Sequence, residues 1–272
     1  MTTTFDRPLA VIGGGAMAEA SVLGAQRSGA LAGSVCVADP SDDRQAVFGR
    51  AVATATEAMD WLDDQGAEGA VMLAVKPQML DAVSSEIGDR VGKRLVVSIL
   101  AGSTSGLVRT AMGGACRVVR VMPNTPALIG RGTSAVSVSP SAFAADGEAS
   151  EALFRGVGDA VVRIDESQMD GFTGVAGSGP AYVFYLAEAM ERAAAEVGLP
   201  VEHARAIVTE TIAGAAELLR QSGDAPVDLR ARVTSKGGTT AAATHVGDDA
   251  GVADIVVRAS TAARDRGQEL GR

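Results

Sequence analysis

The sequence lacks any cluster of positive charge. Its 24 Lys and Arg residues are outnumbered by 33 Asp and Glu residues, which gives a formal net charge of −9. Because binding to DNA or RNA rests mainly on clustered positive charge, we expect no nucleic-acid partner. An anionic ligand must then be held by local features, such as helix N-termini and a few well-placed cations.

Cysteines and long apolar segments are also scarce. The two cysteines, Cys36 and Cys116, lie far apart in apolar runs, so we expect buried thiols and no disulfide framework. No apolar run reaches the roughly 18–20 residues that span a bilayer. Residues 2–5, Thr-Thr-Thr-Phe, do not resemble a secretion signal. We therefore expect a cytoplasmic protein with no membrane contact.

Histidine is equally rare. His203 is flanked by Glu202 and Arg205 on a charged helical face, and His245 ends an alanine-rich helix. The two histidines are too far apart to share a metal ion, and no other cluster of ligand residues accompanies them. We predict surface or capping roles for both, and no metal site.

Hydrophobic residues, in contrast, make up 47 % of the chain against 21 % charged residues, which is typical of a globular protein. In the first half, short β-branched runs alternate with helical stretches. The runs are almost continuously apolar, as strands covered on both faces by crossover helices require. This pattern predicts an α/β fold with a Rossmann-type, mostly parallel sheet. Strands are expected at 9–12, 35–38, 70–75, 95–99 and 118–121, with 136–138 and 160–164 closing the edge.

After residue 164 the sequence pattern predicts helices and no strands. Pro180 suits a first helical turn and Gly198 a helix end. A short helical domain joined to a nucleotide-binding one often serves as an oligomer interface. Helices are expected at 181–197, 201–220, 226–234, 239–247 and about 251–270.

A glycine-rich turn follows the first predicted strand. Gly13-Gly-Gly15-Ala-Met-Ala18 matches the pattern G-x-G-x-x-G/A of dinucleotide-binding proteins. Gly13 allows the tight turn, Gly15 lets the backbone approach a pyrophosphate, and Ala18 permits close packing of helix on strand. Free amides at the helix N-terminus would hold the pyrophosphate. Such a turn can also simply join a strand to a helix, but the flanking elements and the later Asp39 favour cofactor binding.

Asp39 ends the second predicted strand. It is placed to accept a hydrogen bond from the ribose 2′-hydroxyl of NADH and to repel the 2′-phosphate of NADPH. At about 4 Å this repulsion is roughly 1 kcal/mol per unit charge in water and about 4 kcal/mol at an intermediate dielectric. The sequence therefore favours NADH, although Arg44 leaves NADPH open because it can turn toward a 2′-phosphate. Alternatively, Asp39 only caps the next helix.

Loops at the carboxyl ends of later strands should line the same crevice. Three such loops are 74–77, 98–102 and 121–126. Asn124, the only asparagine in the chain, is expected to hold the nicotinamide carboxamide or ribose, although a plain proline-rich turn fits equally well. The predicted cofactor-binding residues are Gly13, Gly15, Ala16, Met17, Asp39, Ala74, Lys76, Pro77, Ala101 and Asn124.

Three motifs occur in order: Val121-Met-Pro-Asn-Thr-Pro-Ala127, Gly177-Ser-Gly-Pro-Ala-Tyr-Val-Phe184 and Val233-Thr-Ser-Lys-Gly-Gly-Thr-Thr240. Together they resemble the pyrroline-5-carboxylate reductases over essentially the whole chain. The resemblance implies NAD(P)H-dependent reduction of pyrroline-5-carboxylate to L-proline, the last step of proline biosynthesis. It also implies a dinucleotide-binding domain at 1–164, a helical dimerisation and substrate domain at 165–272, and a homodimer that in this family can assemble further into a decamer.

The residues of the last motif suit such a substrate. A small cyclic imino acid offers a carboxylate, a ring nitrogen and an apolar ring. A helix N-terminus with free amides and two threonine hydroxyls can orient it, because each hydrogen bond to a charged group contributes roughly 1.5–3 kcal/mol. Thr240 is the candidate catalytic residue, as partner of the ring nitrogen, although small residues can also merely cap a helix. The predicted substrate-binding residues are Ser235, Gly237, Gly238, Thr239 and Thr240.

Two positions depart from the family pattern. Lys236 stands where the family usually has proline, and it either pairs with the substrate carboxylate or, as we favour, points to solvent. Leu100 stands where alanine is common, which adds to the open question of nucleotide preference.

Two other functions are compatible with a Rossmann-type domain followed by helices. A β-hydroxyacid dehydrogenase would use a lysine on the first long helix of the second domain, but residues 180–220 contain no lysine. A non-catalytic NAD(P)-sensing regulator would bind the nucleotide without consuming it.

Overall fold

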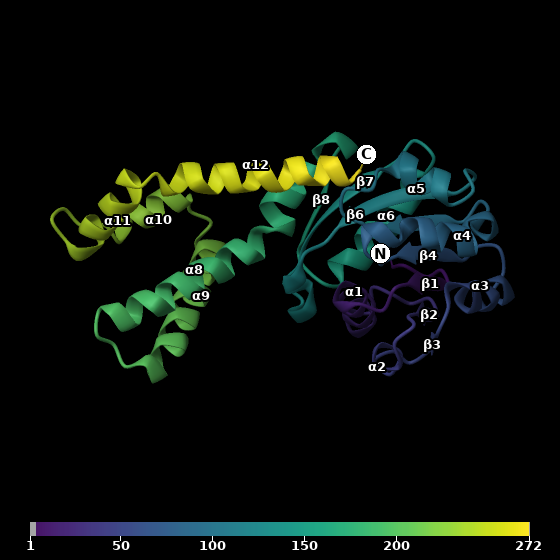
Figure 1. Cartoon of the computed structure of the whole chain (residues 1–272), viewed down its shortest axis with the longest axis horizontal. Coiled ribbons are helices and arrows are strands. Elements are labelled where there is room, and N and C mark those ends of the chain that lie inside the picture. Colours follow the sequence, from purple (N-terminus) through teal and green to yellow (C-terminus); the bar gives the residue numbers. More distant parts are fainter. Residues whose placement is uncertain (1–3, 272) are drawn as a thin grey trace. The chain divides into compact units, whose positions relative to one another are not determined.

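The computed structural model describes residues 4–271 (Figure 1). The chain forms two compact units. The first unit comprises the chain up to Ser178 together with the segment from Ser260 onward, and the second unit is Gly179–Ala259. The predicted boundary at residue 164 lies one residue after the last strand of the sheet, which ends at Arg163. As a division into domains it stays a prediction.

The first unit is built on a sheet whose order, within the described residues, is β3-β2-β1-β4-β5-β6-β7-β8. Strands β6 and β7 pair antiparallel, and the other neighbours pair parallel. The order reverses between β1 and β4, and ligands of such sheets bind outside the carboxyl ends of the strands at this point. The strands are β1 (Leu9–Ile12), β2 (Val35–Ala38), β3 (Ala51–Val52), β4 (Ala70–Leu73), β5 (Leu95–Ser98), β6 (Arg117–Met122), β7 (Thr133–Val138) and β8 (Ala160–Arg163).

Helices cover both faces of this sheet, which explains the continuously apolar strands. Leu9 and Val11 of β1 join one buried cluster with residues of α1 and α6, whereas Ala10 and Ile12 join a second cluster with residues of α3 and α4. Alternate strand residues therefore reach opposite cores. The helices of this unit are α1 (Ala16–Ser28), α2 (Asp42–Gln45), α3 (Ala55–Asp64), α4 (Leu80–Val91), α5 (Ser105–Ala111), α6 (Ala144–Arg155) and α7 (Met169–Phe172).

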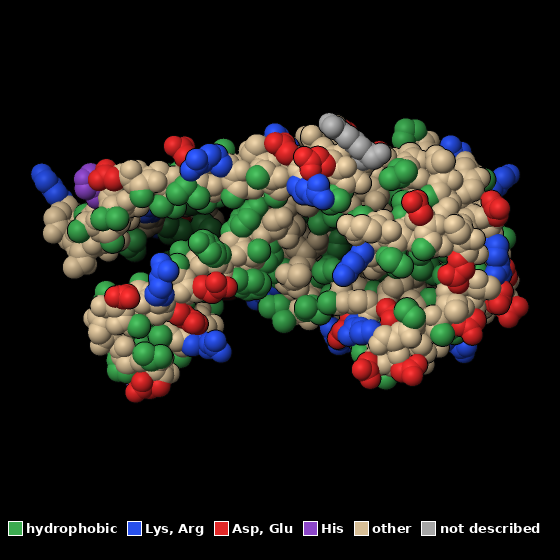
Figure 2. Space-filling model, viewed as in Figure 1, with side chains coloured by type: hydrophobic (Ala, Val, Ile, Leu, Met, Phe, Trp, Pro, Cys, Tyr) green, Lys and Arg blue, Asp and Glu red, His purple; other side chains and the backbone are tan. Residues whose placement is uncertain are grey.

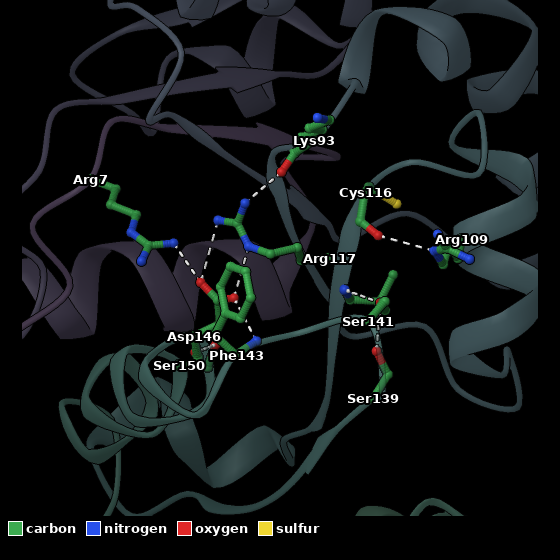
Figure 3. Close-up of polar contacts among 11 residues, drawn as sticks. Arg7, Lys93, Arg109, Cys116, Arg117, Ser139, Ser141, Phe143, Asp146 and Ser150 are labelled. Atoms are coloured by element: carbon green, nitrogen blue, oxygen red, sulfur yellow. Dashed lines mark hydrogen bonds and ion pairs between the residues drawn. The ribbon is translucent and has the colours of Figure 1, made fainter.

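A buried carboxylate stabilises the side of the sheet where the parallel strands begin. Asp146 is fully buried and pairs with Arg7 at 2.7 Å and with Arg117 at 2.8 Å (Figure 3). It also accepts a hydrogen bond from the Phe143 amide at the start of α6. Burial opposes ionisation, but the bonds from Arg117, Phe143 and Arg7 hold the pKa of Asp146 below its usual range. These ion pairs join the amino-terminal ends of β1 and β6 to α6. They lie on the side of the sheet opposite the carboxyl ends of the strands, where ligands are expected.

The second unit is helical, as predicted. Helices α8 and α9 pack on each other and bury Ala194, Ala204 and Val208. None of the helices described between residues 4 and 271 is long and apolar enough to cross a membrane. The helices are α8 (Gly179–Glu196), α9 (Val201–Ser222), α10 (Pro226–Arg232), α11 (Thr239–Asp249) and α12 (Val252–Leu270), the last of which ends in the first unit.

Much of the apolar surface of the second unit is exposed. Phe184 and Tyr185 on α8 are 61 % and 75 % exposed, and Val256 and Val257 on α12 also face outward. Figure 2 shows hydrophobic side chains spread over the surface of α8 and α12.

The fold predicted from the sequence is confirmed, with small shifts of the element ends. Strand β4 ends at Leu73, two residues before the prediction, and β7 begins at Thr133, three residues before it. The two-residue strand β3 was not predicted. Both cysteines are buried and unpaired, as expected, and burial raises the pKa of each thiol.

Candidate active site

A pocket of about 510 Å³ lies at the carboxyl ends of β1, β2 and β4, where the strand order reverses. We call it the crevice pocket. Five of the predicted cofactor-binding residues, separated by up to 63 positions in the chain, line it: Gly13, Gly15, Asp39, Ala74 and Lys76.

The glycine turn has the local geometry that its pattern predicts. Gly13 has a φ of 101°, and a Cβ there would lie 2.8 Å from the Ala74 backbone, so only glycine fits. A Cβ on Gly15, in contrast, would meet nothing within 4 Å, because that residue borders open space. Helix α1 begins directly afterwards with no side chain capping it. Its first amides and its dipole therefore favour an anionic group such as a pyrophosphate.

Two side chains hold the middle glycine of this turn by its backbone. The Gly14 amide donates to Asp39 Oδ2 at 2.8 Å, and Arg44 Nε donates to the Gly14 carbonyl at 2.6 Å. Asp39 Oδ1 also accepts from the Ser41 amide at 3.0 Å. Asp39 does not cap α2, whose N-cap is Ser41, and its hydrogen bond to a ribose hydroxyl stays a prediction. It supports the turn before α2 and lines the crevice pocket.

The residues that form the outer wall of the crevice pocket were not predicted from the sequence. This wall comes from the residues around the start of α3 and from α4 with Met79 just before it. At the α3 end, Glu86 Oε1 accepts from the Thr56 amide at 2.8 Å, which joins the two helices. The segment before α3 follows β3, and a strand of two residues is too short to be recognised by its pattern. The missed residues are Ala53, Thr54, Ala55, Met79, Ala82, Val83 and Glu86.

The other predicted cofactor residues lie on neighbouring elements of the first unit. Ala16 and Met17 form the first turn of α1, and Pro77 starts the 3-10 turn Pro77–Met79 beside Lys76. Ala101 follows β5 and is half-buried. These residues are not among those lining the crevice pocket, so their roles in cofactor binding stay predictions.

Asn124 is buried and its amide is engaged by backbone groups. Its Nδ2 donates to the Ala176 carbonyl at 3.0 Å, and its Oδ1 accepts from the Thr133 amide at 2.9 Å. Ala176 belongs to the π-helical segment Thr173–Gly177, where the Ser178 amide donates to the Thr173 carbonyl five residues earlier. Asn124 therefore ties the loop after β6 to β7 and to this segment. Contact with a nicotinamide remains a prediction.

The predicted substrate residues lie together at the start of α11 in the second unit. Gly237 has a φ of 73°, and Gly238 is the N-cap of α11 with no side chain capping the helix. The positive φ of Gly237 favours glycine at that position, and a Cβ on Gly238 would lie 2.4 Å from Ser235 Oγ, which would have to rotate away. Thr239 and Thr240 form the first helical turn. The result is an open helix N-terminus with hydroxyl groups beside it, suited to a small anion.

The residues discussed outside this turn have simple surroundings. Lys236 is exposed, as are His203 and His245, and His245 lies 3.5 Å from Asp249. Leu100 is buried in the core cluster formed with α3 and α4. Within residues 4–271, no group of three or more His, Cys, Asp and Glu side chains is placed to hold a metal ion.

The fold and the crevice pocket define the class of Rossmann-type oxidoreductases. Residues 8–102 match the family described as NADP oxidoreductase, coenzyme F420-dependent. Residues 166–270 match the family described as pyrroline-5-carboxylate reductase dimerisation. The chain is also 34 % identical to pyrroline-5-carboxylate reductase 2 of Bacillus subtilis (strain 168), over 97 % of this chain and 95 % of that protein. It belongs to the pyrroline-5-carboxylate reductase family, as the three sequence motifs predicted.

Solved structures agree with this assignment. The pyrroline-5-carboxylate reductase of Coxiella burnetii superposes with a TM-score of 0.84 at 31 % identity, and the alignment covers all of both chains. The pyrroline carboxylate reductase of Plasmodium falciparum, solved with NADP bound, superposes with a TM-score of 0.87 at 25 % identity. That alignment covers 99 % of this chain and 100 % of the other.

Proposed function

We propose that this protein reduces pyrroline-5-carboxylate to L-proline with a reduced nicotinamide dinucleotide. The observation that carries the proposal is the relationship to pyrroline-5-carboxylate reductases at 34 % identity along almost the entire chain. Two local features support it: the glycine turn that opens α1, and the uncapped N-terminus of α11 with its threonines.

The first unit would hold the cofactor. Gly15, Ala16 and Met17 present the amides for the pyrophosphate, and the Asp39 carboxylate is the acceptor for a ribose hydroxyl. The apolar wall of the crevice pocket, which includes Met79 and Val83, suits the flat face of an adenine ring. The bound dinucleotide supplies a hydride for transfer to the imine carbon of the substrate.

The loop before α11 would hold the substrate. The Gly238 amide is already bound to the Ser235 carbonyl at 3.0 Å. The amides of Thr239 and Thr240 are therefore the candidate donors to the substrate carboxylate, each worth roughly 1.5–3 kcal/mol. The Thr240 hydroxyl is the candidate partner of the ring nitrogen. Because the imine can be protonated in solution, the protein need not supply a strong acid. Its contribution is then mainly to position and orient the imine for reduction.

We expect NADH to be preferred over NADPH. Asp39 places a carboxylate beside the turn where the adenosine ribose would lie, and a 2′-phosphate there would be repelled. Arg44, the cation that sequence analysis left free to receive that phosphate, donates to the Gly14 carbonyl and to Glu19. The environment of Asp39 therefore suits a neutral ribose hydroxyl.

We further propose that the protein functions as a homodimer, which can assemble into a decamer. Exposed apolar side chains such as Phe184 and Tyr185 on α8 would be covered in such an assembly. In the dimer, residues 237–240 of one subunit would face the crevice pocket of its neighbour and complete the active site. A cytoplasmic location is part of the same proposal.

The decisive experiment offers pyrroline-5-carboxylate with NADH or NADPH and follows loss of the near-ultraviolet absorbance of the reduced nicotinamide. We expect oxidation of the nucleotide and formation of one proline per nucleotide consumed. Tight nucleotide binding with no oxidation would instead support a non-catalytic, NAD(P)-sensing regulator.

A further inference from the structure

Glu19 lies on the first turn of α1, one helical turn beyond Gly15. We propose that Glu19 is a positioning residue for nucleotide preference, because it holds Arg44 away from the place where a 2′-phosphate would lie. This inference rests on the proposed role of the crevice pocket as the dinucleotide site.

The geometry of Arg44 carries the argument. Arg44 belongs to the short helix α2 that follows Asp39, so it is the cation nearest in sequence to the ribose-binding position. Its Nη2 donates to Glu19 Oε2 at 2.8 Å, while its Nε donates to the Gly14 carbonyl at 2.6 Å. The bond to Glu19 neutralises the charge of the guanidinium, and the bond to the Gly14 carbonyl fixes its direction. The Arg44 and Glu19 side chains are 32 % and 34 % exposed, so water screens their attraction only in part.

The charges around the crevice pocket explain why the Glu19–Arg44 pair would affect nucleotide preference. Asp39 and Glu86 contribute negative charge to the lining of the crevice pocket, and Lys76 is the cation among the lining residues. A 2′-phosphate would add close to two further negative charges beside Asp39. While paired with Glu19, Arg44 has its charge neutralised and offsets them little, whereas the ribose hydroxyl of NADH needs no cation. The Glu19–Arg44 pair therefore penalises NADPH selectively.

Neutralising Glu19 should release Arg44. In a Glu19→Gln enzyme we expect the ratio of kcat/KM for NADPH to that for NADH to rise roughly two- to fivefold, the size that a partly exposed ion pair permits. The ratio is the informative quantity, because Glu19 also lies near the pyrophosphate end of α1, and its loss there affects both nucleotides alike. The gain should shrink as salt is raised.

Two further variants test the route through Arg44. The double variant Glu19→Gln with Arg44→Ala should return the ratio to the wild-type value, because no cation is left to receive the phosphate. Glu269→Gln is the matched control: Glu269 pairs with Arg266 at 2.7 Å and is not among the residues lining the crevice pocket. It should leave the ratio unchanged. Glu19→Ala, which preserves helix propensity, should act in the same direction as Glu19→Gln.

The outcomes separate this inference from the proposed function. If the wild-type enzyme oxidises a nucleotide but both Glu19 variants keep the wild-type ratio, Glu19 does not set the preference. A gain that survives removal of Arg44 would equally overturn the proposal. If the wild-type protein oxidises neither nucleotide, the proposed function fails instead. The inference can then still be judged from the calorimetric affinities of NADH and NADPH, whose ratio must shift in the Glu19 variants for it to stand.

Discussion

The two compact units bury their apolar residues to very different degrees. In the first unit, large side chains such as Phe5, Met59 and Phe154 are fully buried between the sheet and its helices. In the second unit, Ala194, Ala204 and Val208 are buried, whereas aromatic and branched side chains on its longest helices are exposed. The first unit has a core of its own. The second has a surface suited to another subunit, and its stability should depend on that partner.

The largest effect that we expect concerns the core of the first unit. Asp146→Asn removes the charge shared by Arg7 and Arg117 and should lower the free energy of unfolding at neutral pH by about 3 kcal/mol, as breaking a buried ion pair does. Chemical denaturation measures this. Asp60→Asn, in an ion pair whose carboxylate is 65 % exposed, is the control and should cost less than about 1 kcal/mol.

The same pair predicts a pH dependence. The pKa of Asp146 is lower in the folded protein than its usual value. Its stabilisation is therefore fully present above the unfolded pKa of about 3.9 and is lost as pH falls through the folded pKa. The stability difference between wild type and Asp146→Asn should be constant near neutrality and shrink below about pH 4. A difference that grew on acidification would contradict the assigned role.

Next in size is nucleotide binding. Gly15→Val should weaken affinity for NADH by about a hundredfold or more, because the side chain occupies the space proposed for the pyrophosphate. The melting temperature should hardly change, since a Cβ at Gly15 meets nothing within 4 Å. Gly49→Val, also in open space, serves as control and should bind normally. Unchanged affinity in Gly15→Val would refute the cofactor assignment.

A smaller effect is expected at the start of α11. Thr240→Ala should lower kcat/KM for pyrroline-5-carboxylate roughly 10- to 100-fold through loss of one hydrogen bond to a charged ring nitrogen. The cofactor affinity, measured by calorimetry, should change little. Thr211→Ala, whose hydroxyl only bonds the Ile207 carbonyl within α9, is the matched control. Equal losses in cofactor affinity and in kcat/KM would count against a place beside the imine.

The last prediction concerns the exposed surface of the second unit. Phe184→Glu should shift the protein toward smaller species in sedimentation at low concentration, because it places a charge in the proposed subunit interface. Ile129→Glu, at an exposed position of the first unit, should leave the assembly unchanged. A monomeric wild-type protein would show that the difference in burial between the two units has another cause.

Sequence reasoning succeeded where a signal is local. Continuous apolar runs marked the buried strands. The glycine turn was recognisable because its glycines lie within three residues of each other directly after a strand, and at Gly13 the backbone requires glycine. It failed where the signal depends on tertiary contacts. Glu166 accepts hydrogen bonds from Ser105 and Arg120, which lie 61 and 46 positions away. The residues next to Glu166 in the sequence do not indicate either of these two partners.

The candidate site shows the same division. The crevice pocket was predicted on the side formed by the glycine turn, Asp39 and Lys76, but its wall from α3 and α4 was not. Asn124 was singled out for its rarity, and the structure shows its amide joining three backbone segments. The sequence could identify Arg44 as a cation near the ribose position, but not that Glu19 and Gly14 engage it.

The final turns of α12 have a consequence for how the protein is made. The chain leaves the first unit at Ser178 and rejoins it at Ser260. A Cβ on Gly102 would lie 2.7 Å from the Gly267 carbonyl, which shows how closely the returning segment fits against the loop after β5. The dinucleotide fold is therefore interrupted by the helical unit. During synthesis it stays incomplete until the helical unit and the segment from Ser260 onward have emerged from the ribosome, although domains generally fold as units from the N-terminus.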